Sequence, residues 1–264
     1  MRKASFIGLL AAMLCAAAPL AAQAAQGGTE IPLSGHINAA MAGRVHAALG
    51  NGKPHVIRIT SSGGEDAPAL AIAADIARSR STLVVDGICA GPCATYLFIA
   101  ATGRSVQPGG LVIFTASATS RLAMVPLQRR GEISRSYADT AQQEARLLRE
   151  ARVSAAMLLE PQLGLEPKCW SLTSRDNMGK AYINYQARAV GWTPSRAYMA
   201  RAGLKIAGYW PEAEPQFQAA LQKALPGGAR GGIVYSTAKA PAAETTLLDR
   251  LQHIAECDSG FRKR

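Results

Sequence analysis

The sequence predicts an α/β domain built around a parallel β-sheet. Apolar, β-branched segments, HVIRIT at 55–60 and TLVVD at 82–86, are the first observation behind this prediction. The second is that each segment is followed by a glycine-containing turn and then by a helical pattern. Strand, turn and helix repeated within about fifty residues is typical of βαβ units, whose strands are parallel.

The first expected helix covers residues 38–49, because Ile37, Met41, Val45 and Leu49 recur at helical spacing and Gly50-Asn51-Gly52 ends the pattern. The pattern after it predicts, in order, a strand at His55–Thr60, a turn at Ser61–Gly64, a helix at Ala67–Arg78, a strand at Thr82–Asp86, a turn at Gly87–Pro92, an apolar helix at Cys93–Ala101 and short strands at Val106 and Leu111–Phe114.

The second half of the chain is expected to be mainly helical. Its predicted elements are a long helical region at Ser134–Leu159, a mixed aromatic segment at Trp170–Gly191, a helix at Pro211–Leu225, a flexible joint at 227–232, a strand at Ile233–Ser236 and a last helix from Ala243 to Cys257. In parallel sheets, ligands bind at the carboxyl ends of strands. A site is therefore expected between the turns at 61–64 and 87–92.

The first 24 residues have the order of a cleaved secretory signal. Arg2 and Lys3 precede an apolar stretch, and Ala22-Gln23-Ala24 is a small-x-small triplet that a signal peptidase can cut. Pro19 disfavours a retained membrane anchor, and no later segment is apolar enough to span a bilayer. We expect a periplasmic or secreted protein with no integral membrane segment after processing.

The mature chain is expected to be one domain with additions. Residues 25–200 are predicted to form the α/β domain and residues 201–264 a C-terminal helical extension. Removal of residues 1–24, which carry Arg2 and Lys3, lowers the formal net charge from +11 by two, to +9. No nucleic-acid motif accompanies this excess, and its arginines are spread over a loop and a helix, so we expect solvated faces and no nucleic-acid partner.

Four cysteines remain after processing: Cys89, Cys93, Cys169 and Cys257. An even number in an oxidising compartment favours disulfides, although four cysteines allow three pairings. Cys89 and Cys93 could form a local bridge, while Cys169 and Cys257 would close a long loop. Cys89 and Cys93 lack a third and a fourth ligand in order around them, so no metal site is expected. No cofactor is expected either.

The stretch from Val56 to Thr115, with IRITSSGGE, TLVVDGICAGPCATYLFIAATGR and VQPGGLVIF, resembles the proteolytic subunit of Clp protease, a member of the crotonase superfamily, and its exported relatives. The resemblance implies a repeated ββα spiral around a parallel sheet, with helical C-terminal additions. It also implies self-association, because such proteins form rings or smaller homo-oligomers.

The resemblance further implies where catalytic groups would lie. Ser62-Gly63-Gly64 matches the turn that donates an oxyanion-hole N–H, for which glycine suits the close approach. The nucleophilic serine matches Gly91, which has no side chain, and the second oxyanion donor matches Pro92, which has no N–H. The general-base histidine matches Phe114, whose ring cannot accept a proton.

The aspartate of the resembling family falls near Lys168 or Cys169, where no carboxylate is in register. The histidines at 36, 46, 55 and 253 are expected to be ordinary surface or cap residues. The leading prediction is therefore a non-catalytic, Clp-like protein of the bacterial envelope that acts as a scaffold or binds a peptide or an envelope protein.

Two other functions stay open. One is an envelope hydrolase or peptidase with a relocated nucleophile; the candidates are Cys89, Cys93, Thr95, Ser61, Ser62, Thr115 and Ser117. The other is docking of a partner protein or the cell wall by the aromatic residues between Trp170 and Tyr209, although such rings are more often core.

Overall fold

The computed structural model describes residues 29–123, 135–164, 168–175, 179, 181–188, 191–226 and 233–254. The predicted signal segment, the joint at 227–232 and Cys257 lie outside the described residues. The predicted boundary between 200 and 201 stays a prediction.

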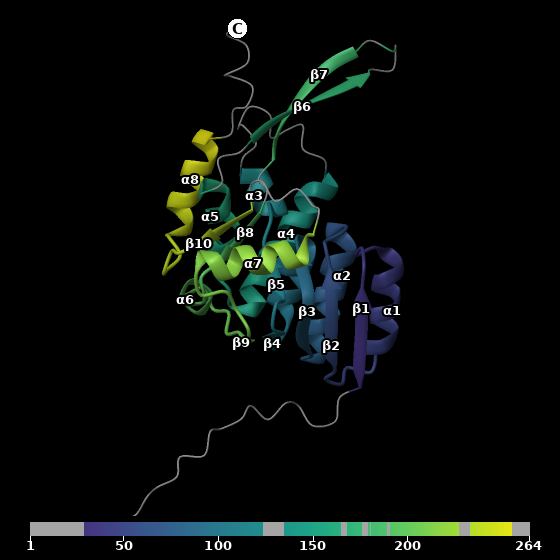
Figure 1. Cartoon of the computed structure of the whole chain (residues 1–264). Helices are drawn as coiled ribbons and strands as arrows, with labels where there is room; N and C mark the ends of the chain where they lie inside the picture. Colours follow the sequence, from purple (N-terminus) through teal and green to yellow (C-terminus); the bar gives the residue numbers. More distant parts are fainter. Residues whose placement is uncertain are drawn as a thin grey trace, which may run out of the picture.

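A parallel sheet lies at the centre of the structure and confirms the α/β prediction (Figure 1). All strand pairs in this sheet are parallel. Its strands, in spatial order, are β1 (Glu30–Ser34), β2 (Val56–Ser61), β3 (Thr82–Ala90), β4 (Gly103–Val106) and β9 (Ala207–Gly208), and β5 (Leu111–Ile113) also pairs with β3.

Strand β3 is longer than predicted. The expected turn at 87–92 is wrong, because the strand continues through Gly87 to Ala90. Its first part pairs with β4 and its second part, from Ile88, pairs with β5. A Cβ at Gly87 would lie 3.2 Å from the side chain of Thr60, so the glycine permits a close approach of β2 rather than a turn.

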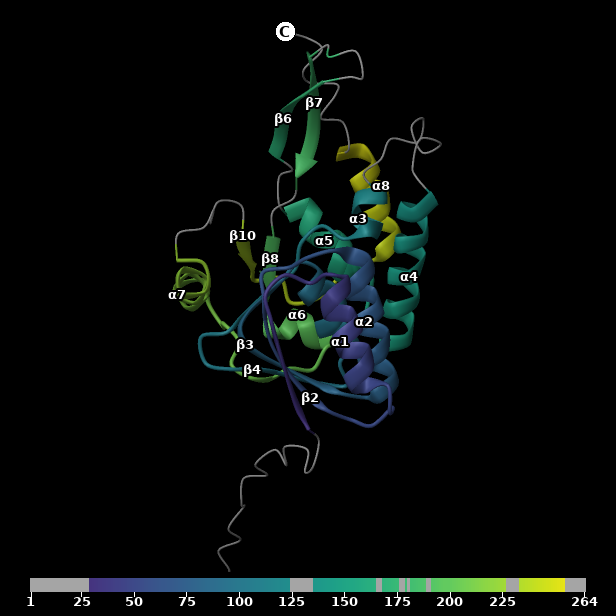
Figure 2. The same cartoon turned by 90° about the vertical axis from the view of Figure 1, so that its right-hand side faces the viewer.

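Helices cover both faces of the sheet. Figure 2 shows α1 (Ala39–Leu49), α2 (Asp66–Ser79) and α4 (Arg135–Ala151) on one side and α7 (Glu214–Ala224) on the other. Helix α1 begins where predicted, because Asn38 accepts a hydrogen bond from the Met41 N–H at 3.0 Å. On the opposite face, Phe217 packs in a buried cluster with residues of β3 and β5.

The predicted apolar helix after β3 forms as η1 (Cys93–Phe98), all six residues of which are buried. It has π-helical hydrogen bonding, which the sequence did not indicate. Beyond its end, the Arg104 side chain donates to the carbonyl oxygens of Phe98 at 2.7 Å and Ile99 at 2.5 Å. This guanidinium therefore satisfies carbonyls at the end of a buried helix.

Two helices occupy the long helical region predicted at Ser134–Leu159. Helix α4 ends at Ala151, and α5 (Ala156–Gly164) follows. Arg152 has a φ of 56°, and the Val153 N–H donates to the Leu148 carbonyl at 2.9 Å, which closes α4 as a left-handed cap. A short helix, α3 (Ala118–Ala123), precedes α4 and was not predicted.

The segment from 168 to 209 contains more strand than expected. Strands β6 (Lys168–Arg175) and β7 (Ala181–Arg188) form an antiparallel hairpin that extends from the body (Figure 1). Strand β8 (Gly191–Pro194) pairs with β10 (Ile233–Ser236), and α6 (Arg196–Arg201) and α8 (Glu244–Ile254) follow β8 and β10 respectively.

Two of the aromatic residues considered for docking belong to the core. Trp192 is 2% exposed and Tyr198 is 0% exposed, and their rings meet edge to face at 5.2 Å. Docking through these two rings is therefore wrong, since packing against the core buries them. The side chains of Trp170, Tyr182 and Tyr185 lie outside what the structure describes.

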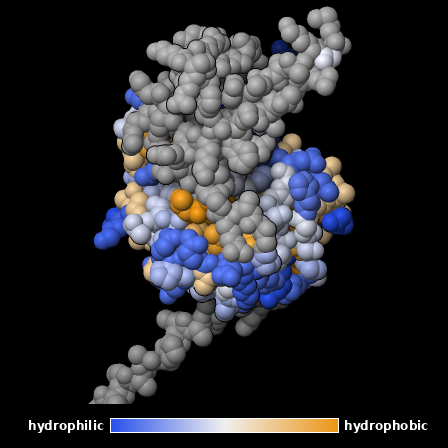
Figure 3. Space-filling view, turned by 45° about the horizontal axis from the view of Figure 1, so that its top comes forward, coloured by the Kyte–Doolittle hydropathy of each residue, from blue (hydrophilic) through white to orange (hydrophobic). Residues whose placement is uncertain are grey.

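Where Figure 3 is coloured, hydrophilic residues are interspersed with hydrophobic ones, and a small strongly hydrophobic area lies near the middle. Within the described ranges, Val234 is the one large hydrophobic side chain classed as exposed. No helix in those ranges has the length and apolar character needed to cross a bilayer.

Candidate functional site

The turns after β2 and β3 lie against each other. Ser61 is paired in register with Cys89, so both turns leave the same end of the sheet. A Cβ at Gly63 would lie 3.4 Å from the Ala90 carbonyl oxygen and 3.6 Å from Pro92 Cδ. Because Gly63 is buried in this contact, a bulkier residue there would force the two turns apart.

Gly91 forms a sharp elbow between β3 and η1. Its φ of 55° lies in the left-handed region, its N–H donates to the Ile113 carbonyl at 2.9 Å, and its carbonyl accepts from the Thr95 N–H at 2.8 Å. A Cβ at Gly91 would point toward Thr115 Oγ1, 3.4 Å away. A strained strand-to-helix turn is also the backbone shape that displays a nucleophilic serine in other hydrolases, but glycine offers no hydroxyl here.

Of the N–H groups at the elbow and the facing turn, those of Gly63 and Gly91 are already engaged, and Pro92 has none. The Gly63 N–H donates to Ser61 Oγ at 3.2 Å, and the Ser61 hydroxyl is within 3.1 Å of the Gly63 carbonyl oxygen. The Gly91 N–H is bonded to β5, and Pro92 has no N–H. Gly64 instead allows a close approach of Ile37, whose N–H donates to the Gly63 carbonyl at 2.9 Å.

Phe114 is a core residue. Its side chain is 0% exposed and packs edge to face on Phe98, with ring centroids 6.5 Å apart. Its backbone N–H and carbonyl both bond to Trp192, at 2.9 and 2.8 Å. The position that the resemblance assigned to a general base thus holds a buried apolar ring in contact with the ring of Phe98.

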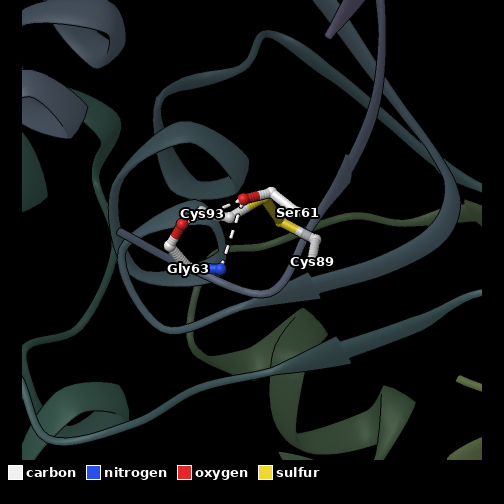
Figure 4. The surroundings of a disulfide bond; sticks show 4 residues. All are labelled: Ser61, Gly63, Cys89 and Cys93. Atoms are coloured by element: carbon white, nitrogen blue, oxygen red, sulfur yellow. Dashed lines mark hydrogen bonds between the residues drawn. A yellow bond between two sulfur atoms is a disulfide. The ribbon is translucent and has the colours of Figure 1, made fainter. Parts of the chain in front are cut away.

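Cys89 and Cys93 form a disulfide beside Ser61 and Gly63 (Figure 4). Their Cα atoms are 5.3 Å apart and both residues are 0% exposed. The bridge confirms the local pairing. Cys257 lies outside the described residues, and so does the side chain of Cys169, whose backbone lies in β6 beside Lys168. In the oxidised protein, neither bridged sulfur is a thiolate that could act as a nucleophile.

The disulfide can be tested by peptide mapping. The tryptic peptide 81–104 contains both cysteines and no internal Lys or Arg. Without reductant, we expect this peptide to be two hydrogen masses lighter than its thiol form and resistant to alkylation. The double variant C89A/C93A should lose about 2 kcal/mol of unfolding free energy, the chain-entropy value for so short a loop. Alkylation of both thiols in unreduced protein would contradict the bridge.

The candidate hydroxyl nucleophiles are held in different surroundings. Ser61 is 1% exposed and bonded to Gly63, while Ser117 is 1% exposed and within 3.3 Å of the Ser120 hydroxyl. Thr95 Oγ1 is buried and finds no hydrogen-bond partner among the described residues. Ser62 is the exposed hydroxyl of this set.

Sequence reasoning missed the position of His36. The Gly35 N–H donates to the Thr60 carbonyl at 3.0 Å and the Ile37 N–H donates to the Gly63 carbonyl at 2.9 Å. His36, between them and exposed, therefore lies on the loop next to the turn that carries Ser62. Parallel pairing of β1 with β2 produces this proximity, which separation in sequence concealed.

A buried carboxylate behind the elbow was also missed. Glu144 of α4 is 0% exposed and accepts hydrogen bonds from the Tyr96 hydroxyl at 3.0 Å and from the N–H groups of Ala118 at 3.0 Å and Thr119 at 3.1 Å. It thus caps the first turn of α3. Burial raises the pKa of Glu144 above its ordinary range, and the hydrogen bonds it accepts oppose this effect only in part.

The raised pKa makes stability depend on pH. Because folded Glu144 binds its proton more tightly than the unfolded chain does, its contribution is fully present below the ordinary carboxyl pKa and is lost as the pH rises through the folded value. The slope is at most about 1.4 kcal/mol per pH unit. Denaturant unfolding across pH should show this slope in the wild type and lose it in Glu144→Gln. Glu150→Gln, an exposed site on α4, is the matched control and should keep it.

No three His, Cys, Asp or Glu side chains within the described ranges gather into a set that could hold a metal ion.

Of the arginines expected on solvated faces, Arg121 is instead engaged in contacts with other side chains. It pairs with Asp66 at 2.5 Å and lies over the Tyr137 ring, 5.8 Å from its centroid. It therefore joins the last turn of α3 to the starts of α2 and α4.

No protein-family model matches this chain, and no curated protein matches it. Among solved structures, it is similar to an asparagine-to-aspartate mutant of ClpP1 from Listeria monocytogenes, at 20% identity and a TM-score of 0.36, over 46% of this chain and 71% of that one. It is also similar to ClpP1 from Listeria monocytogenes, at 17% identity and a TM-score of 0.31, over 44% and 78%. The α/β assignment rests on the sheet described above.

Proposed function

We propose that this chain is an exported, Clp-protease-like protein that lacks serine-peptidase catalysis and acts as a binding or scaffold protein. One observation carries the proposal. The elbow between β3 and η1 is Gly91, which has no hydroxyl, and the residue that follows β5 is Phe114, whose ring is buried. Acyl transfer by a serine enzyme needs a hydroxyl, a base and oxyanion donors together.

The surroundings of the elbow support the same proposal. Gly63 and Gly91 are buried against each other, and the N–H of each is engaged within the protein. The disulfide joins the end of β3 to the start of η1. A bridged, packed elbow of this kind suits a rigid scaffold, and the oxidised bridge fits export to the periplasm. Self-association belongs to the same proposal.

The second candidate is a hydrolase with a relocated nucleophile. It is favoured by the placement of exposed Ser62 and exposed His36 on neighbouring loops at the carboxyl end of the sheet. A serine beside a histidine is the minimum of a nucleophile–base pair. The two candidates differ at the loops that carry His36 and Ser62: the first assigns no catalysis to the protein, and the second places it on these loops.

A protein-hydrolysis assay tests the proposal. With fluorescently labelled casein, we expect the purified protein to show no turnover above buffer, and Gly91→Ser to show none, because a serine at 91 lacks a base and an oxyanion donor. An active Clp peptidase run in parallel confirms the assay. Turnover in the wild type that is lost in Ser62→Ala or His36→Ala would favour the second candidate instead.

A further inference from the structure

A cleft of about 1050 Å³ opens between α2 and α4, and no residue of the elbow lines it. Leu70, Ala74 and Ala77 line it from α2, and Asp139, Gln143 and Arg146 line it from α4. Residues three or four apart share one face of a helix, so each helix contributes one continuous stripe to the cleft. Figure 2 shows α2 and α4 side by side on the same face of the sheet.

The two helices run in the same direction. Arg121 pairs with Asp66 at the start of α2 and lies over the ring of Tyr137 at the start of α4. The ends of both helices therefore lie at the other end of the cleft, where Arg80 and Arg104 also line it. Gly91 lies beyond the far end of β3, whose nine residues span about 30 Å. The second end of the cleft is therefore far from the elbow.

The charges in the cleft are unevenly distributed. Asp139 lies toward its first end, while Arg78, Arg80, Arg104 and Arg146 outnumber Glu150 toward its second. Arg78 pairs with Asp75. In the part of the chain that the structure describes, the guanidinium groups of Arg80 and Arg146 have no ion-pair or hydrogen-bond partner.

Arg104 adds a desolvated cation to this second end of the cleft. Burial lowers its pKa to about 10, so a bound anion would be favoured there. Its Nε and Nη2 are already bonded to helix carbonyls, which fixes the guanidinium in place.

The spacing of opposite charges sets a length for the ligand. Arg146 follows Asp139 by seven residues, or about 10 Å along the helix axis. An extended peptide of three residues spans about the same distance. Between the two charges, Gln142 and Gln143 offer amide donors and acceptors, and the alanines of α2 provide a shallow apolar wall.

We propose that the cleft between α2 and α4 binds a short zwitterionic peptide of about three residues, with its C-terminal carboxylate at Arg80, Arg104 and Arg146 and its N-terminal ammonium at Asp139. The inference uses no group of the elbow and stands independently of the proposed function. Small side chains suit the wall formed by Ala74 and Ala77.

Isothermal titration calorimetry with trialanine tests the inference. We expect saturable binding to the purified chain, weakened about tenfold in Arg146→Gln, which removes one charge-assisted contact. Arg149→Gln on the same helix is the matched control, because Arg149 is equally exposed but does not line the cleft, and it should bind as the wild type does. Unchanged circular dichroism and melting temperature would show that both variants fold.

Two blocked peptides locate the ends of the ligand. Trialanine amide, which lacks the carboxylate, should bind the wild type at least about tenfold more weakly than trialanine. N-acetyl-trialanine, which lacks the ammonium group, should also bind the wild type more weakly than trialanine, and Asp139→Asn should not weaken its binding further. Absence of saturation, equal binding to Arg146→Gln and Arg149→Gln, or displacement of trialanine by equimolar inorganic phosphate would each overturn the inference.

Discussion

Replacing Phe114 with alanine is expected to lower the free energy of unfolding by about 3–5 kcal/mol, the range for removing a buried phenyl ring. The side chain is 0% exposed and loses its edge-to-face contact with Phe98 on truncation. The measurement is denaturant unfolding of the purified variant. Phe114→Leu, which keeps most of the apolar volume, is the control and should cost less than about 1.5 kcal/mol.

The same position distinguishes a packing role from a catalytic one. If Phe114→Ala were nearly as stable as the wild type, the ring would contribute little to the stability of the core, and the packing role assigned to Phe114 would be wrong. Phe114→His should also be destabilising, because an imidazole would be buried against the apolar ring of Phe98.

Gly64→Ala is the second substitution with a large expected effect. A Cβ there would overlap the Ile37 carbonyl oxygen and lie 2.6 Å from both the Cβ and the N of Ile37. These contacts are to backbone, so the loop after β1 must move, at a cost of about 3 kcal/mol or more. Loss of the Ile37 N–H bond to Gly63 should accompany the shift.

Helix α1 provides the matched control for this substitution. Gly43 has nothing within 4 Å of a built Cβ and lies inside the helix. Gly43→Ala should therefore stabilise the protein by about 1 kcal/mol, the difference in helix propensity. Equal effects of the two substitutions on the denaturation midpoint would show that the contact between Gly64 and Ile37 does not form.

The sequence predicted the elements whose signals are local. Periodic apolar residues located α1 and α2, the β-branched run located β2, and the alternation of these elements predicted the parallel sheet. Cys89 and Cys93 were one of the two pairings considered, and the bridge forms because the end of β3 and the start of η1 bring their Cα atoms to 5.3 Å.

What escaped prediction depends on contacts between distant residues. Gly87 resembles a turn residue, yet the strand continues past it because Ile88 to Ala90 pair with β5, and Thr60 approaches Gly87 closely. Glu144 lies in a helical segment rich in Glu and Arg, where nothing in the sequence marks it as buried, but helix α3 supplies the N–H groups that hold it in the interior. The loops that carry His36 and Ser62 become neighbours only through the pairing of β1 with β2.

Labelling with a fluorophosphonate probe, read by intact mass, tests the proposed absence of serine-peptidase chemistry most directly. We expect the unmodified mass for the wild type and for Gly91→Ser, since a serine alone at the elbow would have neither a base nor a second oxyanion donor. A mass increase by one probe adduct, mapped to Ser62 and abolished by His36→Ala, would contradict the account and place an active serine on the loop beside the elbow.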